Sequence, residues 1–269
     1  MAKKYRVIIL MTSGEDIVEF GVDIVKNIVQ CKDIDIPAIF VTDIGRRAQQ
    51  GSFFKRAIKK AKERKSFTIV HIYYYVKSKV LGRKCNWTFE PKIICANLKN
   101  YFTGDIHYVN DLYSNETMNL IKLYNPDLCF HNGHVIIKKP LLSVAKNGII
   151  GYHHGDLTKY RGGLPCFWEL FNNEKKVGVT LQILNSQLDM GRIIMQKFIK
   201  IERFDTLKSL QKKVHYNTTD MGYESIKLML NPNFEPKVPD RFGVYNKYPT
   251  FCQWVKFQIL MFKKRIFSN

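Results

Sequence analysis

The amino-acid sequence predicts an α/β fold in which helices cross over between the strands of a parallel sheet. Two apolar runs, YRVIIL (5–10) and IPAIFVTD (36–43), have the composition of buried strands. Between them, EDIVEFGVDIVKNIVQ (15–30) carries apolar residues at helical spacing. A β-α-β opening of this kind is typical of parallel sheets, and we interpret the rest of the chain on the same plan.

The later segments continue to alternate between strand and helix patterns. We expect strands at 106–110, 126–133, 149–155, 177–184 and 191–201, and helices at 114–124, 140–148, 165–175 and 205–230. Ser114 is the predicted N-cap of its helix, Gly148 closes the short helix before it, and Asp205 caps the longest helix. Residues 66–104 are rich in aromatic side chains and show no clear period.

Length and composition favour one large domain with a short extension. The chain has 269 residues, 45% of them hydrophobic, and we divide it into a domain of residues 1–204 and a C-terminal helix, Pro-rich stretch and basic-apolar tail over 205–269. Six scattered cysteines form no metal knuckle or redox pair, which predicts a reduced, cytoplasmic location. The N-terminal apolar run turns polar at Thr12, too early for a signal peptide or a membrane span.

The chain is strongly basic, with a formal net charge of +20. Residues 46–65 hold nine basic residues and one acid at a spacing that predicts a helix, and FKKRI (262–266) is basic as well. Such a surplus favours anionic partners, namely nucleic acids, phosphorylated substrates or membrane surfaces, against the alternative of a simple compositional drift toward lysine. The two basic segments could therefore dock on an anionic membrane, pack on the core, or form the interface of a homodimer.

Polar groups cluster where predicted strands end, which is where open α/β sheets bind ligands. They are HNGH (131–134), HHGD (153–156) and Asp189. From these residues alone, four interpretations remain open, three of them chemical and one structural. The histidines could bind a metal, although their spacing matches no standard zinc pattern. They could form an acyltransferase HHxxxD motif, although Asp156 stands at the wrong offset. One histidine could be a base tuned by a distant aspartate, or all could simply cap strands.

Two ordered motifs resemble the 10-formyltetrahydrofolate-dependent formyltransferases, the family of the methionyl-tRNA, glycinamide ribonucleotide and sugar N-formyltransferases. The motifs are GYHHGDLTKYRGGLP (151–165), with its Arg-Gly turn, and LDMG (188–191). The resemblance is close over residues 128–200 and looser over the β-α-β opening. It implies a Rossmann-like, mostly parallel sheet of the formyltransferase type with a short C-terminal appendage. It also implies transfer of a formyl group from 10-formyltetrahydrofolate to an amine.

The resemblance also assigns roles to site residues. It implies that His153 faces the formyl group and assists proton transfer, while Asp189 sets the ionisation and orientation of that ring. Gly151 stands where the family has an asparagine that donates a hydrogen bond to the developing oxyanion, and loss of such a donor typically reduces the rate about 100- to 1000-fold. Asn132, at the end of the neighbouring predicted strand, is the expected replacement donor.

The pterin is expected between residues 134–137 and the Asp189 loop. The candidates for binding this formyl donor are His134, Val135, Ile136, Ile137, Gly155, Asp156, Leu157 and Thr158. On the acceptor side the candidates are Lys159, Tyr160 and Arg161, against the alternatives of solvation for the lysine and turn packing for the other two. No metal is expected.

The acceptor is predicted to be an amino sugar linked to a nucleotide, of the kind used to build cell-surface polysaccharides. About 65 residues follow the core, and they show too little strand pattern for the C-terminal barrel of the tRNA enzymes, so tRNA is less favoured and DNA is not expected. Glycinamide ribonucleotide enzymes are shorter and lack the basic insert. The alternatives are a methionyl-tRNA formyltransferase-like enzyme, or a folate-binding protein weakened in catalysis by Gly151.

Overall fold

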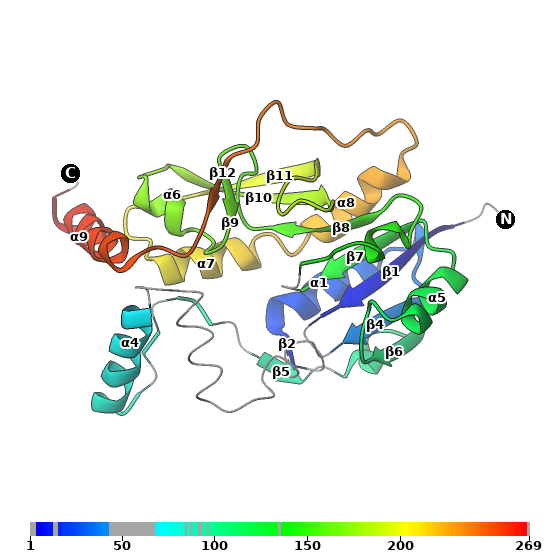
Figure 1. The fold of residues 1–269 in the computed structure, drawn as a ribbon, viewed down its shortest axis with the longest axis horizontal. Helices are drawn as coiled ribbons and strands as arrows, with labels where there is room; N and C mark the ends of the chain where they lie inside the picture. Colours follow the sequence, from blue (N-terminus) through cyan, green and yellow to red (C-terminus); the bar gives the residue numbers. More distant parts are fainter. Residues whose placement is uncertain are drawn as a thin grey trace.

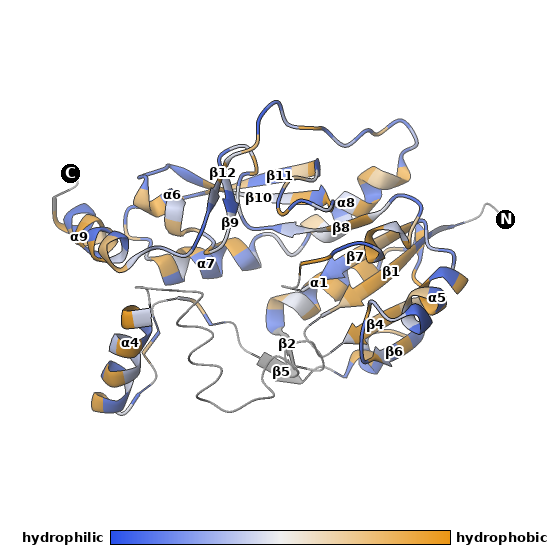
Figure 2. Cartoon of the chain, viewed as in Figure 1, coloured by the Kyte–Doolittle hydropathy of each residue, from blue (hydrophilic) through white to orange (hydrophobic). Residues whose placement is uncertain are grey.

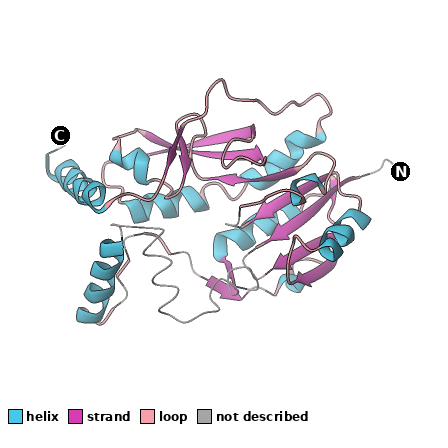
Figure 3. Ribbon diagram, in the orientation of Figure 1, coloured by secondary structure: helices cyan, strands magenta, loops and turns pink. Residues whose placement is uncertain are grey.

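The computed structural model describes residues 4–12, 16–42, 68–83, 85–86, 88–90, 93–95, 97–133 and 136–267. A large twisted sheet runs through the molecule, with helices on both of its faces (Figures 1 and 3). The basic segment 46–65, predicted to be helical, lies outside the described residues, as do His134 and Val135.

The sheet has the strand order β11-β10-β8-β7-β1-β4-β6. Its strands are β1 (Tyr5–Met11), β4 (Ala38–Thr42), β6 (Asp105–Val109), β7 (Leu128–Asn132), β8 (Ile149–His153), β10 (Lys176–Ile183) and β11 (Arg192–Lys200). From β6 to β8 every neighbouring pair is parallel, whereas β10 is antiparallel to β8 and β11 is antiparallel to β10. The predicted α/β class with a mostly parallel sheet is confirmed.

Three short pairings lie beside this sheet. They are β3 (Ile34–Asp35) with the start of β1, β2 (Asp16–Val18) with β5 (Ile93–Cys95), and β9 (Tyr160–Gly162) with β12 (Val244–Asn246). The last pairing matters for the site because it ties the Arg-Gly turn at 161–162 to the C-terminal part of the chain.

Strand β1 explains why the central strands are apolar throughout. Val7, Ile9 and Met11 belong to the core on the face of α1 (Glu19–Val29) and α8 (Met221–Leu230). Ile8 and Leu10 belong to the core on the opposite face, under α5 (Asn115–Leu123). Both faces are covered, so alternation of apolar and polar residues is absent, as expected for parallel strands (Figure 2).

The remaining helices in the described ranges are α4 (Thr68–Val80), α6 (Phe167–Phe171), α7 (Leu207–Tyr216) and α9 (Phe251–Phe267), with short 3₁₀ turns at Leu98–Asn100 and Leu141–Ser143. The predicted helix over 140–148 is wrong beyond its 3₁₀ turn, although Gly148 takes the left-handed φ of +83° that was expected of it. Ser114 is confirmed as an N-cap, since its hydroxyl accepts from the Thr117 amide at 3.1 Å.

The predicted helix over 205–230 is two helices separated by the turn at 217–220. The cap is Thr206 and not Asp205: Thr206 and Ser209 form a reciprocal capping box, and Asp205 instead accepts from Lys213 at 3.0 Å. Leu207, Leu210 and Met221 lie in the same core as β1, so α7 and α8 complete the core of the sheet. The boundary after residue 204 therefore does not separate two cores.

Candidate active site

The carboxyl ends of β7 and β8 border a cavity of about 420 Å³. His131 and Gly133 come from the end of β7, His153 from the end of β8, and Asp189 from the loop between β10 and β11. Ile137, Leu184 and Leu188 supply an apolar part of the wall. The position is the one that open α/β sheets use for ligands, and the volume suits a small organic molecule.

The His153 ring is held between two oxygen acceptors. Its Nδ1 atom lies 3.3 Å from a carboxylate oxygen of Asp189, and its Nε2 atom lies 2.9 Å from the Tyr160 carbonyl. The doubly protonated ring can donate to both oxygens, whereas either neutral tautomer leaves a nitrogen lone pair facing one of them. The geometry therefore favours the charged ring.

The ionisation of the pair follows from burial and from mutual attraction. Burial of the ring, the largest single influence on it, acts to lower the pKa of His153, but the hydrogen bond and charge of Asp189 and the Tyr160 carbonyl outweigh it and raise that pKa. For Asp189, burial acts to raise the pKa, yet His153, the Gly162 amide and Arg161 together lower it. Both groups are thus stabilised as ions.

The backbone around Asp189 is arranged to hold its carboxylate. Asp189 has a left-handed φ of 52°, a region that aspartate tolerates better than most residues. Its second carboxylate oxygen accepts from the Gly162 amide at 2.9 Å. The loop and the Arg-Gly turn are therefore joined through the same side chain that contacts His153.

The three residues predicted to bind the acceptor make contacts within the protein. The Arg161 Nε atom donates to the Gly243 carbonyl at 2.7 Å, and the Tyr160 hydroxyl donates to Glu174 at 3.0 Å. Lys159 forms an ion pair with the same glutamate at 3.1 Å. None of the three lines the 420 Å³ cavity, so in this structure their side chains brace the turn.

Among the residues predicted to bind the pterin, those that the structure describes divide into two groups. Ile136 and Ile137 line the cavity. Gly155, Asp156, Leu157 and Thr158 do not line it. Asp156 accepts from the Thr158 amide at 2.9 Å, an Asx turn, and also from Gln196 at 3.3 Å, while Leu157 is fully buried. This second group shapes the chain between β8 and β9.

Asn132 and Gly151 differ in their access to the cavity. The Asn132 amide donates to the Gly21 carbonyl of α1 at 2.9 Å, and Asn132 is absent from the cavity wall. It would have to break that bond to replace the missing donor. Gly151 does line the cavity, in extended strand backbone, and a Cβ atom there would meet Leu184 Cδ1 at 3.4 Å, an ordinary contact.

His131 and His154, the other described histidines of the two motifs, have structural contacts. His131 Nε2 lies 3.2 Å from the Thr12 hydroxyl, and the His154 ring stacks on Tyr152 with a centroid separation of 5.7 Å. The Tyr152 hydroxyl in turn donates to the Thr218 carbonyl at 2.7 Å. Among the residues that the structure describes, no group of three His, Cys, Asp or Glu side chains could hold a metal ion.

Sequence reasoning missed one buried acid near the site. Glu169, in the first turn of α6, is 3% exposed and borders a small recess together with His153 and Trp168. Burial raises the pKa of Glu169 to about 7, with smaller opposing influences that include His153. The only signal in the sequence is a charged residue within an apolar stretch, CFWELF (166–171).

Comparison with known proteins places this site in a family. The profile of the formyl transferase family matches residues 47–224, and the chain belongs to that family. The chain is 32% identical over 148 residues to the bifunctional polymyxin resistance protein ArnA of Wigglesworthia glossinidia brevipalpis, covering 54% of this chain and 23% of that protein. It is 35% identical over 118 residues to the methionyl-tRNA formyltransferase of Thermodesulfovibrio yellowstonii, covering 44% and 38%. The matches span less than half of either relative.

Solved structures share the fold over nearly the whole chain. A sugar N-formyltransferase from a Shewanella species superposes with a TM-score of 0.57 at 15% identity, covering 97% of this chain and 87% of that one. An N-formyltransferase from Helicobacter canadensis, solved with folinic acid and dTDP-3-aminofucose, gives a TM-score of 0.56 at 16% identity, covering 97% and 81%. At sequence identities this low, the structural likeness establishes that these proteins share the fold of this chain.

Proposed function

We propose that the protein transfers a formyl group from 10-formyltetrahydrofolate to the amino group of a nucleotide-linked amino sugar. The observation that carries the proposal is the contact between the buried His153 ring and the partly buried Asp189 carboxylate at the wall of the cavity. The match to the formyl transferase family spans both residues, and the resemblance of the motifs at 151–165 and 188–191 to that family supports their role as the catalytic pair.

The cavity fits the donor. Ile136, Ile137, Leu184 and Leu188 offer apolar contact to a flat ring system, and Gly133 and Gly151 leave the strand ends free of side chains. When bound, 10-formyltetrahydrofolate supplies an electrophilic formyl carbon. The residues of this chain would hold the ring and place the His153 side chain beside the reacting group.

His153 and Asp189 would supply charge and proton handling. The charged His153 ring stabilises negative charge that develops in the cavity, a task for which Gly151 offers no side-chain amide. Asp189 keeps the ring protonated and oriented, so that it can give a proton to that developing negative charge. The ring, then neutral, could accept the proton that an acceptor amine must lose, which returns it to the charged form. Because Tyr160 offers only a backbone carbonyl to Nε2, that contact can be exchanged without breaking a side-chain ion pair.

The choice of acceptor rests on the structural neighbours. The Helicobacter canadensis enzyme was solved with a dTDP-linked amino sugar, and its fold covers the C-terminal region of this chain as well as the sheet. A second candidate has its own support, because relatives that match by sequence include methionyl-tRNA formyltransferases. The two acceptors can be separated directly.

The test is a transfer assay with 10-formyltetrahydrofolate and a panel of nucleotide-linked 3- and 4-amino sugars, beside methionyl-tRNA. Mass spectrometry would identify the formylated product. We expect transfer to one of the sugars and loss of transfer in His153→Ala, with His154→Ala as the matched neighbouring control. Transfer to methionyl-tRNA alone would assign the second candidate. Folate binding without transfer to any amine would contradict an enzymatic role.

A further inference from the structure

Helices α4 and α9 combine positive charge with exposed apolar side chains. Both carry basic residues and neither carries an acid. The basic residues of α4 are Lys77 and Lys79, and those of α9 are Lys256, Lys263, Lys264 and Arg265. The two helices lie at the end of the molecule away from α5, and along both of them apolar and polar turns alternate (Figures 1 and 2).

One stripe of α9 anchors it to the body. Phe257 and Met261, one helical turn apart, are 3% and 8% exposed and belong to the main core. The Phe257 ring lies 4.7 Å from that of Phe167 in α6. The other side of the helix remains outside, since Ile259 is 51% and Phe262 is 62% exposed.

Helix α4 is attached beside α9 through aromatic rings. Tyr73 and Tyr74 both lie 6.2 Å from the ring of Trp254, measured between centroids. Most of the apolar side chains of α4 nevertheless face outward, and its exposed members are Ile69, Ile72, Tyr73, Tyr75, Val76 and Val80. Single exposed apolar residues are ordinary, but two adjoining helices that expose so many mark an interaction surface.

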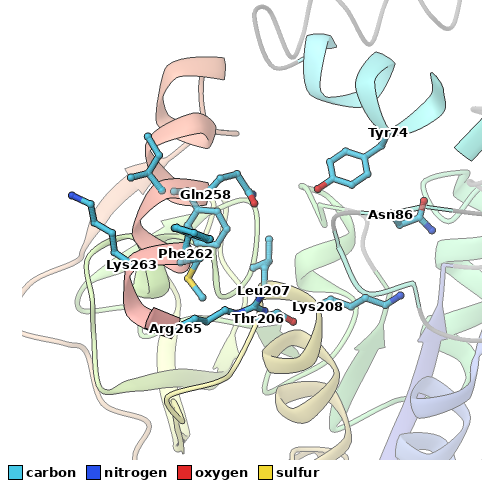
Figure 4. A pocket seen from close by; sticks show the side chains of 12 residues that line it. Tyr74, Asn86, Thr206, Leu207, Lys208, Gln258, Phe262, Lys263 and Arg265 are labelled. Atoms are coloured by element: carbon cyan, nitrogen blue, oxygen red, sulfur yellow. The ribbon is translucent and has the colours of Figure 1, made fainter. Parts of the chain in front are cut away.

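A groove of about 700 Å³ lies between the two helices and the start of α7. Tyr74 points from α4 toward α9, while Phe262 lies on the facing side (Figure 4). Lys208, Lys263 and Arg265 stand around the same groove. Apolar contact and positive charge are thus combined at one place. We call α4, α9 and this groove the α4–α9 surface.

We propose that the α4–α9 surface docks the protein on a membrane containing anionic lipids. Long basic side chains flanking exposed apolar ones match an interface in which phosphate groups lie above acyl chains. In the part of the chain that the structure describes, no helix is long and apolar enough to cross a bilayer, so the contact would be peripheral.

Charge and side-chain chemistry favour this partner over two others. A symmetric dimer through the same surface would bring two sets of lysines and arginines together with no acid from either helix, which is repulsive. Nucleic acid would satisfy the charges, but exposed aliphatic residues such as Ile72, Val80 and Ile259 gain little from phosphates or base edges. A lipid surface uses both features at once.

The experiment is co-sedimentation of the full chain with phosphatidylcholine vesicles and with vesicles that also contain phosphatidylglycerol. We expect binding to the anionic vesicles and its loss near 1 M salt, where the Debye length is about 3 Å. Lys263→Gln with Lys264→Gln should weaken binding about 25-fold, or about fivefold for each charge removed near the surface. Phe262→Ser should weaken it about tenfold by removing interfacial burial.

The matched control removes two exposed lysines from elsewhere, Lys99→Gln with Lys122→Gln, and should bind as the unaltered protein does. Circular dichroism and formyl transfer to a free nucleotide-linked sugar would show that every variant is folded, so this inference can fail while the proposed function stands. Equal recovery on neutral and anionic vesicles would overturn the proposal. So would a dimer, or a tRNA complex, that the Lys263 and Lys264 changes disrupt in the absence of vesicle binding.

Discussion

The cavity at the ends of β7 and β8 and the groove of the α4–α9 surface both combine cationic and apolar groups, but in opposite ways. In the cavity, the buried His153 ring meets a carboxylate at 3.3 Å and a carbonyl at 2.9 Å. At the groove, Lys263 and Arg265 both stand on α9, and neither α9 nor the neighbouring α4 contains an acid. Fixed partners provide the orientation that chemistry needs, whereas charges of one sign on an exposed surface provide attraction for a large anionic partner.

The largest expected effect lies in the cavity. His153→Ala and Asp189→Asn should each lower the turnover number about 100- to 10,000-fold, the usual contribution of a positioned acid-base group. Asparagine keeps the left-handed backbone that position 189 requires, so Asp189→Asn tests charge without adding strain. Initial rates of transfer would measure the loss. Turnover within a few-fold of that of the unaltered enzyme would contradict the catalytic role of the pair. A parallel loss of vesicle binding would show that the cavity and the α4–α9 surface do not act separately.

The next effect concerns stability and separates the two sides of α9. Phe257→Ala should lower the free energy of unfolding by about 3–5 kcal/mol, because it leaves a cavity beside Phe167. Phe262→Ala, on the exposed side of the same helix, should change it by less than about 0.5 kcal/mol. Urea unfolding would measure both. Equal effects would show that the outward side of α9 is also packed.

A pH series should act on the cavity region through Glu169. Burial raises the folded-state pKa of this carboxyl to about 7, above the ordinary value of 4.5. Between these values the unfolded chain has released the proton and the folded chain retains it, so the free energy of unfolding falls as the pH rises toward 7. The total decrease in the free energy of unfolding that Glu169 causes should be up to about 3 kcal/mol. Glu169→Gln should remove this contribution and leave the smaller fall that the raised pKa of His153 causes above pH 6.5.

The measurement is urea unfolding at intervals from pH 5 to pH 8. The opposite trend is expected of Asp189, whose lowered pKa contributes stability that is lost only as the solution becomes acidic, below 3.8. Retention of the full slope in Glu169→Gln would show that another group titrates in this range. Vesicle binding by the α4–α9 surface should keep its dependence on salt in this variant.

The smallest expected effect restores a side chain to the wall of the cavity. Gly151→Asn should raise turnover about tenfold, less than the full value of an oxyanion donor because Leu184 occupies part of the space. Gly151→Ala adds a Cβ atom without a donor and is the matched control. The same turnover in both variants would indicate that the charged His153 ring already supplies the stabilisation.

The sequence predicted the parts of the molecule that depend on local pattern or on an ordered motif. The apolar runs at 5–10 and 36–43 form adjacent parallel strands. The resemblance paired His153 with Asp189, 36 positions later in the chain, and in the structure the two side chains are in contact. Sequence patterns could not show which polar side chains would form hydrogen bonds within the protein. Asn132 donates to Gly21, far from it in sequence, and that contact depends on how α1 packs.

Other differences have the same physical origin. The helical pattern over 205–230 continues through a turn, because Asn and Thr at 217–219 fit a helix in pattern although they favour turns. Glu169 is buried in α6, which packs against α9 and borders a recess together with residues of β9, and no local rule predicts such tertiary burial. Helix α4 escaped prediction because most of its apolar residues are exposed and leave no apolar period.

The position of β1 has a consequence for how the protein is made. This strand leaves the ribosome before the other strands of the sheet, but in the sheet it stands between β4 and β7, and β7 is encoded more than a hundred residues later. At typical synthesis rates, Val7 to Met11 wait on the order of ten seconds for that neighbour. The hairpin of β10 and β11 can close as soon as it emerges. We therefore expect the nascent chain to depend on chaperones until β7 reaches its place beside β1.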